Sequence, residues 1–432
     1  MTPIPAPDNQ ASLDALRALV KQRSVLAALE VFHTSLGDIF RLPLPGFNPV
    51  MMAGPEASHF VLVEQRGDLR WRPEGDPVTD LLRQGVLVTD GDFHDGLRRE
   101  MAPALHRRML AGYVDAMVES TDRVIDTWDE ARGPLDMLVE MRRIALLILM
   151  KTLFAVDFSA DLDRLWAPIL RALRYISPGA WMLWRDIPRP GYRAARRELD
   201  GYLYRLIAER RQHPASDGDL LTLLIDAGMS DDLIRDQLVT MLIAGHDTST
   251  ALLSWALYAL VQHPAAQDRA RREVLDVVGT RPPEHAHAGE LRYLEQVINE
   301  TLRLYPPIHL GSRRAAADLD FNGYTIPAGT RVLYSIYLTH RDARHWPDPA
   351  AFDPERFAPE QARQRAPYTF LPFGGGPRNC MGMAFAQVEV KIVLARILQR
   401  YTLADTGQTV HLHMGATLEP RPGVRVHVRR QD

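Results

Sequence analysis

The sequence predicts a mostly α-helical protein with a minor β region, which is an α+β fold class. Apolar residues recur at helical spacing through about 93–305 and again through 383–401. Stretches typical of strands fall only at about 38–65, 313–340 and 409–429. No internal repeat, low-complexity tract or break in composition divides the chain, so we expect a single domain over residues 1–432.

The first part of the chain mixes short strands with helices. An amphipathic helical region over 11–40 is followed by predicted strands near 40–44 and 50–53 and a helix over 55–65. Residues 70–92 are expected to form a loop, because prolines and glycines interrupt them. The helices that follow are predicted at roughly 93–105, 110–131, 136–156 and 161–176.

Residues 177–191 form an aromatic- and proline-rich connection to a helix over 192–212. This connection is either a lid over an apolar site or a loop docked by its tryptophans. The longest helical run, 231–263, is apolar on nearly all sides, so we expect it to pass through the middle of the molecule. The remaining predictions are helices over 265–278, 289–305 and 383–401, a hairpin over 321–329, and strands over 331–337 and 409–429.

Composition narrows the classes of function. A net charge of -3 argues against nucleic-acid partners and against binding to an anionic membrane. The one cysteine excludes an intramolecular disulfide and fits a reducing compartment. The N-terminus lacks the pattern of a signal peptide, and the longest apolar run, 144–156, falls short of the about 20 residues of a spanning helix. We therefore expect a cytoplasmic monomer without a membrane anchor.

The cysteine, Cys380, lies in the stretch Phe-Leu-Pro-Phe-Gly-Gly-Gly-Pro-Arg-Asn-Cys-Met-Gly, residues 370–382. Its glycines and proline predict a tight loop just before a helix begins at Met383. The free N–H groups and the positive dipole at a helix start favour a thiolate. A lone thiolate on a stiff loop is typical of an axial metal ligand, whereas a cysteine without such a context is more often a small buried hydrophobe.

The longest helix carries polar residues at its centre, in the stretch Ala-Gly-His-Asp-Thr-Ser-Thr, residues 244–250. A hydroxyl that bonds back to a carbonyl can open the helix and leave a groove. Asp247 and Thr248 could then deliver protons to a group bound beside the groove. A helix break or a satisfied polar cluster is the alternative interpretation.

Several cations have the spacing of carboxylate-binding groups. His94 and Arg98 are four residues apart on one helical face, and Arg313-Arg314 precedes the hairpin. We call the polar residues 244–250 at the centre of the longest helix the polar notch. The thiolate, this notch and three arginines (Arg98, Arg313, Arg378) would together suit a flat cofactor with one axial metal position and two carboxylates. Haem fits this description, and thiolate ligation of haem iron favours O–O cleavage.

With these residues in place, the sequence resembles the cytochrome P-450 family of haem-thiolate monooxygenases. The cysteine loop matches the family pattern F-x-x-G-x-R-x-C-x-G at Phe373, Gly376, Arg378, Cys380 and Gly382. Three further motifs match, in the family's order: A/G-G-x-D/E-T at Ala244, Gly245, Asp247 and Thr248, E-x-x-R at Glu300 and Arg303, and P-E-R-F at Arg356.

The resemblance implies the cytochrome P-450 fold, a triangular helical prism with haem b between the long central helix and the cysteine-loop helix. It implies that Cys380 is the axial ligand of the haem iron. Thr248 would hydrogen-bond the bound oxygen, and Asp247 would relay protons. The other implied residues are a structural ion-pair triad (Glu300, Arg303, Arg356) and a cofactor-binding set (His94, Arg98, Ala244, Thr248, Arg313, Phe373, Arg378, Gly382, Ala386).

The implied activity is insertion of one atom of O₂ into an apolar organic substrate, by hydroxylation or epoxidation. The double arginine and the aromatic segment favour lipids, terpenoids, steroids or carotenoids. Electrons are expected from a separate ferredoxin or flavodoxin with an NAD(P)H reductase, because the chain ends soon after the cysteine-loop helix. Expected pocket residues are Ile243, Ala244, Ile308, His309 and Leu310; His309 either binds a polar end of the substrate or is structural.

Three other functions compete with this one. A peroxide-driven peroxygenase is disfavoured because the acid–threonine pair Asp247-Thr248 is intact. A haem sensor or electron carrier would need neither a proton relay nor a substrate pocket. A nucleotide-binding enzyme with the triple glycine as its phosphate loop is excluded, because no Gly-Lys-Ser/Thr follows.

Overall fold

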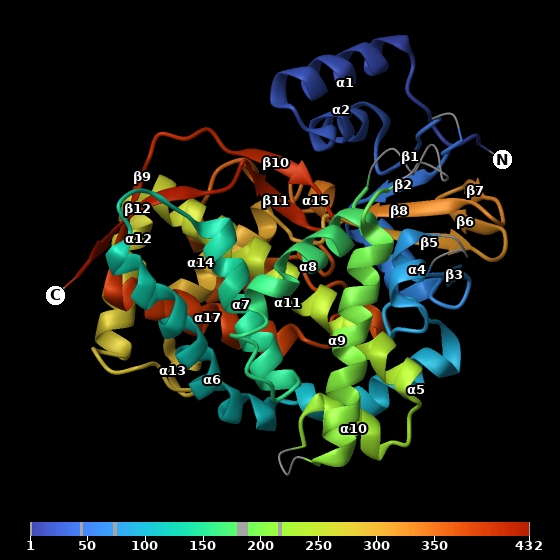
Figure 1. The fold of residues 1–432 in the computed structure, drawn as a ribbon. Coiled ribbons are helices and arrows are strands. Elements are labelled where there is room, and N and C mark those ends of the chain that lie inside the picture. Colours follow the sequence, from blue (N-terminus) through green and yellow to red (C-terminus); the bar gives the residue numbers. More distant parts are fainter. Residues whose placement is uncertain (1, 44–45, 72–75, 179–188, 215–217, 432) are drawn as a thin grey trace.

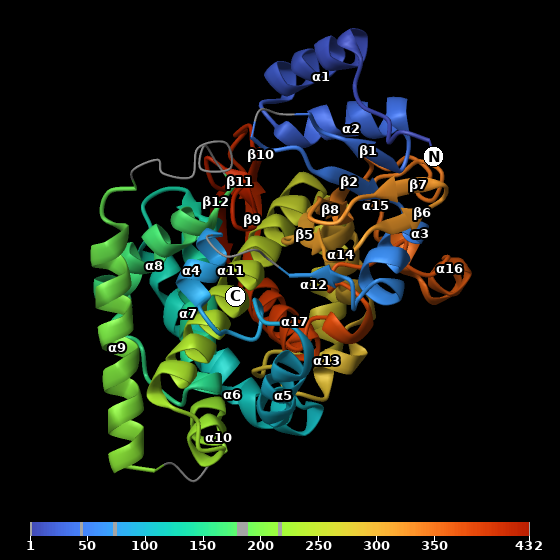
Figure 2. The same ribbon diagram turned by 90° about the vertical axis from the view of Figure 1, so that its right-hand side faces the viewer.

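A computed structural model describes residues 2–43, 46–71, 76–178, 189–214 and 218–431. Helices make up most of the molecule, and the strands form small sheets around them, as Figures 1 and 2 show. The mostly helical α+β class predicted from the sequence is therefore confirmed.

The helices are α1 (Asn9–Gln22), α2 (Val25–Leu36), α3 (Pro55–His59), α4 (Pro77–Leu82), α5 (Gly91–Met101), α6 (Arg107–Ile125), α7 (Met137–Leu153), α8 (Leu162–Ile176), α9 (Tyr192–Gln212), α10 (Leu220–Asp226), α11 (Asp231–Gln262), α12 (Pro264–Val277), α13 (His287–Glu290), α14 (Arg292–Leu304), α15 (Ile336–Thr339), α16 (Pro359–Gln364) and α17 (Met383–Arg400). Short 3-10 or π turns are η1 (Phe60–Glu64), η2 (Ala102–Leu105), η3 (Asp126–Glu130), η5 (Pro354–Phe357) and η6 (Gly376–Arg378).

The strands are β1 (Ile39–Arg41), β2 (Val50–Ala53), β3 (Leu69–Arg70), β4 (Leu135–Asp136), β5 (Leu310–Ala315), β6 (Leu319–Phe321), β7 (Tyr324–Ile326), β8 (Arg331–Ser335), β9 (Tyr401–Asp405), β10 (His411–Met414), β11 (Leu418–Arg421) and β12 (Arg425–Arg430). The largest sheet has the order β1-β2-β8-β5-β3, and its β2–β8 pair is parallel. Smaller sheets pair β10 with β11, β4 with β12 and β9, and β6 with β7.

Helix α11 lies at the centre of the molecule in both Figures 1 and 2, as the sequence predicted. It begins at Ser230, whose hydroxyl accepts the backbone N–H of Leu233, and two aspartates in its first turn complement the helix dipole. A Cβ added to Gly245 would lie 2.2 Å from Leu149 Cδ1, so this glycine lets α7 approach α11 closely. Helices α7 and α11 are therefore in close contact at the polar notch.

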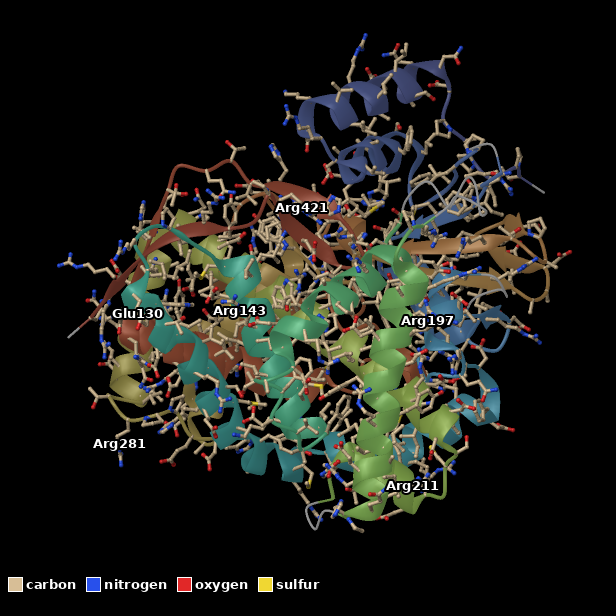
Figure 3. All side chains as sticks on the ribbon, in the orientation of Figure 1. Glu130, Arg143, Arg197, Arg211, Arg281 and Arg421 are labelled. Carbon is tan, nitrogen blue, oxygen red and sulfur yellow. The ribbon has the colours of Figure 1, made fainter. Side chains whose placement is uncertain are left out.

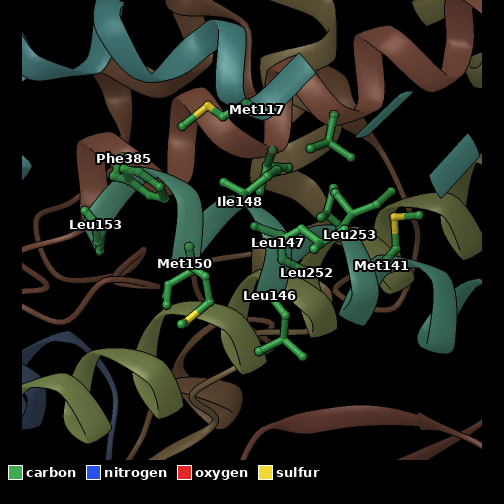
Figure 4. Close-up of a cluster of buried hydrophobic side chains, with 14 of the residues drawn as sticks. Met117, Met141, Leu146, Leu147, Ile148, Met150, Leu153, Leu252, Leu253 and Phe385 are labelled. Carbon is green, nitrogen blue, oxygen red and sulfur yellow. The ribbon is translucent and has the colours of Figure 1, made fainter. Parts of the chain in front are cut away.

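The apolar run predicted as a buried core helix forms most of α7, which is buried along nearly its whole length. Figure 4 shows it packed among Met117 of α6, Leu253 of α11 and Phe385 of α17. This cluster packs α7 against α6, α11 and α17 in the main hydrophobic core. Among the described residues, no helix has the length and apolarity needed to cross a membrane.

Near the N-terminus, the single amphipathic region predicted over 11–40 is wrong in detail. The chain breaks it into α1 and α2 because Arg23 adopts a left-handed conformation (φ 53°) and the Ser24 hydroxyl then caps the next helix. The predicted loop over 70–92 also contains a helix, α4. Asp76 caps this helix and Pro77 occupies its first turn, where proline is favoured, so the breakers seen in the sequence are a helix start.

Further along, the strand predicted over 331–337 ends at Ser335, whose hydroxyl accepts the N–H of Leu338 and starts α15. The helix predicted over 289–305 is α14, and the one-turn helix α13 precedes it. Strand β9 and helix α10 were missed. Most of the aromatic connection predicted over 177–191 lies outside the described residues.

Candidate active site

The cysteine loop is held in one conformation by its glycines. Gly374 (φ 71°) and Gly376 (φ 64°) adopt the left-handed conformation that glycine tolerates best. A Cβ added to Gly376 would lie 2.3 Å from the carbonyl oxygen of Leu62. The backbone N–H of Cys380 donates to the carbonyl of Phe373 at 2.8 Å, which closes the loop just before α17 begins. Any side chain at Gly376 would therefore displace the loop that presents Cys380.

The Cys380 side chain keeps exposed surface, although protein atoms surround the loop closely. Burial raises the pKa of the thiol above its usual value, and a hydrogen bond from the Gly382 backbone and the positive charge of Arg98 offset this only in part. The Gly382 N–H therefore favours the thiolate, in the direction predicted for a helix start, but desolvation by the protein atoms has the larger effect on the pKa. A metal cation on the sulfur is the kind of partner that would stabilise the thiolate.

Four predicted cationic groups come together beside this loop. Arg98 of α5 donates to the carbonyl and side-chain oxygens of Asn379 at 2.8 and 3.1 Å. Arg378 pairs with Asp90 at 2.6 Å. The buried guanidinium of Arg313 lies 4.4 Å from the centre of the Trp71 ring, and that of Arg378 lies 5.7 Å from it.

His94 belongs to the same cluster. Burial lowers its pKa, and the charges of Arg378 and Arg98 lower it further. Its Nδ1 lies 2.7 Å from Asp95 Oδ1, and Asp95 in turn accepts from Arg66. The predicted clamp is thus a set of groups from three regions of the chain, each with a neighbouring protein partner.

Two of these guanidiniums lack a carboxylate partner. In the described parts of the chain, neither Arg98 nor Arg313 has a carboxylate oxygen within 4.0 Å. Arg98 donates to Asn379 and Arg313 to the carbonyl of Ser312 at 2.8 Å, which are neutral acceptors. Since guanidiniums form their strongest hydrogen bonds with carboxylates, the site fits a flat group that carries two carboxylates beside the exposed Cys380.

The polar notch of α11 presents partly exposed residues in an otherwise buried stretch. Ala244, Gly245 and Thr248 keep accessible surface, while their neighbours Ile243, His246 and Asp247 are buried. The Thr248 hydroxyl donates to the carbonyl of Ala244 at 2.8 Å, which is the predicted back-bonding. The helix nevertheless continues through the notch, so the break considered from the sequence does not occur.

The other predicted pocket residues differ in how far they are exposed to solvent. Ile308 is 39% exposed and Leu310 is partly buried. His309 is buried, and desolvation lowers its pKa to about 4, so it is neutral near pH 7. Phe373, Gly382 and Ala386 all lie in or next to the cysteine loop, with Gly382 immediately before α17.

Asp247 has partners that the sequence did not reveal. Its Oδ1 accepts from Arg142 Nη2 of α7 at 3.2 Å, and its Oδ2 accepts from the Thr417 hydroxyl at 2.8 Å. Arg142 Nη2 also donates to Glu419 Oε1 of β11 at 2.6 Å. Burial raises the pKa of Asp247 even though Arg142 opposes the shift. One signal was available: an arginine at the start of a strongly apolar helix needs a buried acid.

Two further polar residues connect the elements around the site. The Ser249 hydroxyl of α11 donates to Glu389 of α17 at 2.6 Å, and burial raises the pKa of Glu389 to about 8. His340 Nε2 accepts the N–H of Leu371, at the start of the cysteine loop, at 2.9 Å. Glu389 and His340 stand outside every motif used above, so only their burial in the folded chain identifies them.

The ion pair of Glu300 and Arg303 is completely buried. Arg303 donates to both carboxylate oxygens of Glu300 at 2.7 Å. Its remaining donors bind the carbonyls of His340, Pro349 and Ala351. Arg356 Nε lies 3.5 Å from Glu300 Oε1. These contacts tie α14 to the segment 340–356 and, through His340, to the cysteine loop.

Arg303→Gln is expected to lower the free energy of unfolding by about 3–5 kcal/mol, because it leaves the buried Glu300 charge without a partner. Urea denaturation of the variant and the wild type measures this difference. Arg363→Gln is the matched control, since its pair with Glu360 is 3.9 Å apart and both side chains are largely exposed. The control should change stability by about 1 kcal/mol or less. Equal losses in both variants would contradict the structural role of the buried pair.

Comparisons with known proteins agree with this geometry. Residues 15–424 match the sequence model of the family described as "Cytochrome P450". The chain is 33% identical over 421 residues to the "Putative cytochrome P450 139" of Mycobacterium tuberculosis, covering 93% of this chain and 97% of that protein. It is 32% identical over 346 residues to the "Cyclooctat-9-en-7-ol 5-monooxygenase" of Streptomyces melanosporofaciens, covering 76% and 74%.

Among solved structures, the chain resembles "Retinoic acid bound cyanobacterial CYP120A1" with a TM-score of 0.86. The match covers all of both chains at 26% sequence identity. This likeness confirms the fold that the sequence motifs implied.

Proposed function

The chain belongs to the cytochrome P450 family, and on that premise we propose that it inserts one oxygen atom from O₂ into a lipid- or terpenoid-like substrate. The enzyme class, a haem-dependent cytochrome P450 monooxygenase, follows from the family membership and from the named relatives. The observation that carries the site is the exposed Cys380 beside two guanidiniums, Arg98 and Arg313, that donate only to neutral acceptors among the described residues.

We assign the cofactor, proposed to be haem b, to the space between this loop and the notch of α11. Cys380 would ligate the iron, and Arg98, Arg313, Arg378 and His94 would hold the two propionates. When bound, a thiolate-ligated haem supplies the chemistry of O–O cleavage. The remaining proposed contacts come from Ala244 and Thr248 on α11 and from Phe373, Gly382 and Ala386 around the cysteine.

The proposed catalytic pair is Asp247 and Thr248. The Thr248 hydroxyl holds a proton beside the partly exposed surface of the notch, where it now donates to Ala244. Burial favours the protonated form of the neighbouring Asp247 carboxyl. Asp247 would therefore act as the acid that replaces a proton given up at Thr248. General acid catalysis of this kind contributes about 10²–10⁴-fold to a rate.

The proposed substrate is apolar with one polar end. Ile308 and Leu310 offer accessible apolar surface, and so does Ala244 on α11. Among the similar proteins, one is named as a monooxygenase of cyclooctat-9-en-7-ol and another was solved with retinoic acid. Both names describe largely hydrocarbon molecules with a single polar group. Electrons are proposed to come from a separate ferredoxin or flavodoxin with an NAD(P)H reductase, in the cytoplasm.

Isotope labelling tests the reaction. The protein is supplied with ¹⁸O₂, NADPH and either a ferredoxin or a flavodoxin system, together with substrates chosen by their shift of the haem spectrum. The proposal expects products that gain one ¹⁸O atom and depend on the electron donor. Oxidation that occurs only with added hydrogen peroxide would overturn the monooxygenase proposal in favour of a peroxygenase.

A further inference from the structure

One buried arginine lies between two carboxylates from distant parts of the chain. Arg142 Nη2 is 2.6 Å from Glu419 Oε1 and 3.2 Å from Asp247 Oδ1. The three side chains are 8%, 13% and 3% exposed, in the order Arg142, Glu419 and Asp247. A single guanidinium nitrogen thus serves two acids, and the shorter contact goes to Glu419.

Helix α11 and the β10–β11 hairpin supply the other titratable and charged groups around Arg142, Glu419 and Asp247. On α11, the buried His246 has a pKa lowered to about 3, so it is neutral. On the β10–β11 hairpin, burial and the charge of Arg421 lower the pKa of His413, and Thr417 donates to Asp247. Arg421 Nη2 lies 3.4 Å from Glu419 Oε2 and its side chain is 52% exposed; Figure 3 labels it near the β10–β11 hairpin. The charged groups therefore alternate in sign from solvent to the core: Arg421, Glu419, Arg142 and Asp247.

We propose that Arg142, shared between Glu419 and Asp247, is a positioning residue that sets how readily Asp247 holds a proton. This rests on the proposed function, in which Asp247 supplies protons to the notch. Because Glu419 takes the shorter contact, Asp247 is the acid that Arg142 holds less firmly. Thr417 fixes the other oxygen of Asp247, so the carboxyl keeps its orientation while its charge changes.

Two substitutions act on Asp247 in opposite directions. Glu419→Gln removes the competing anion, so Arg142 pairs with Asp247 alone and the ionised form of Asp247 is favoured. Arg142→Gln removes the cation and leaves two acids together, so the protonated form is favoured. A charge at this distance moves a carboxyl pKa by about 1–3 units, and the two variants should differ in sign. If the cluster were purely structural, the two variants would not shift the pKa of Asp247 in opposite directions.

The measurement is an infrared pH titration of the haem-loaded protein without substrate. The carboxylic-acid band that is lost in Asp247→Asn identifies Asp247. Relative to wild type, this band should disappear about one pH unit or more lower in Glu419→Gln and persist to higher pH in Arg142→Gln. Arg142→Lys should return the titration most of the way to wild type. Arg421→Gln is the matched control, and its solvent-screened charge should leave the band unchanged.

Folding of each variant is checked by its haem spectrum. If Arg142→Gln does not fold, Glu419→Gln and Arg142→Lys still decide the question, because both keep the core filled. The proposal would be overturned if the titration of the Asp247 band shifts in the same direction in Glu419→Gln and Arg142→Gln, or does not shift in Glu419→Gln. The titration needs neither turnover nor a known substrate. If the band shifts as expected while the pH profile of turnover does not follow it, the proton-supply role of Asp247 fails and the positioning role of Arg142 stands.

Discussion

Replacing Cys380 with serine is expected to abolish monooxygenase turnover and the thiolate signature in the haem spectrum. The hydroxyl is a poorer metal ligand than a thiolate at neutral pH and donates less electron density to iron. The fold should survive, because the loop depends on Gly376 and on the backbone bond from Cys380 to Phe373, and serine retains both. Circular dichroism and the carbon-monoxide spectrum of the reduced protein measure the two effects separately.

Met381→Leu is the matched control for Cys380→Ser. It alters the adjacent, partly buried side chain and leaves the sulfur ligand in place. It should keep the thiolate spectrum and substantial turnover. Full turnover in Cys380→Ser, or equal losses in the two variants, would show that the sulfur is not the working ligand.

Asp247→Asn is expected to slow product formation by about 10²–10⁴-fold, the usual contribution of a general acid. The amide fills the same space. Its oxygen can still accept from Arg142, and its N–H₂ can donate to the Thr417 hydroxyl, which can accept as well as donate, so the loss should reflect the missing proton. Electron consumption should fall less than product formation, because reduction does not need this acid. The ratio of product formed to NADPH consumed is therefore the informative measurement.

The same helix offers a matched control in Asp236. This aspartate is also buried, is paired with an arginine at 2.9 Å, and has a pKa raised by burial. It lies outside the polar notch and contacts the loop at Gln84 instead. Asp236→Asn should leave the product-to-NADPH ratio near that of wild type. An equal fall in that ratio for both aspartates would mean that burial, and not proton delivery, explains the loss.

The parts of the site that were predictable are those that depend on local sequence. The conformation around Cys380 requires glycine at fixed positions, and the Glu300–Arg303 pair follows from spacing on one helix turn. The central position of α11 follows from its apolar surface on all sides. Each of these constraints is met within a few residues of the chain, so it leaves a recognisable pattern.

The parts of the site that were not predicted depend on contacts between residues far apart in the sequence or on physical effects that oppose one another. Arg142 meets Asp247 and Glu419 across 105 and 277 residues of sequence, and no local pattern records such pairs. The pKa of the Cys380 thiol reflects burial, which raises it, against the Gly382 hydrogen bond and the Arg98 charge, which lower it, and the sequence does not show how these effects balance. The break between α1 and α2 depends on one left-handed residue, Arg23, for which the sequence gives little warning.

The central claim is that Cys380 binds haem iron through its sulfur. The carbon-monoxide difference spectrum of the reduced wild-type protein tests this most directly, because the position of the main absorption band reports the ligand opposite carbon monoxide. A thiolate ligand predicts the strongly red-shifted band that distinguishes haem-thiolate proteins. A band at the position found for histidine-ligated haem in the intact, folded protein would contradict the assignment of Cys380 and the function derived from it.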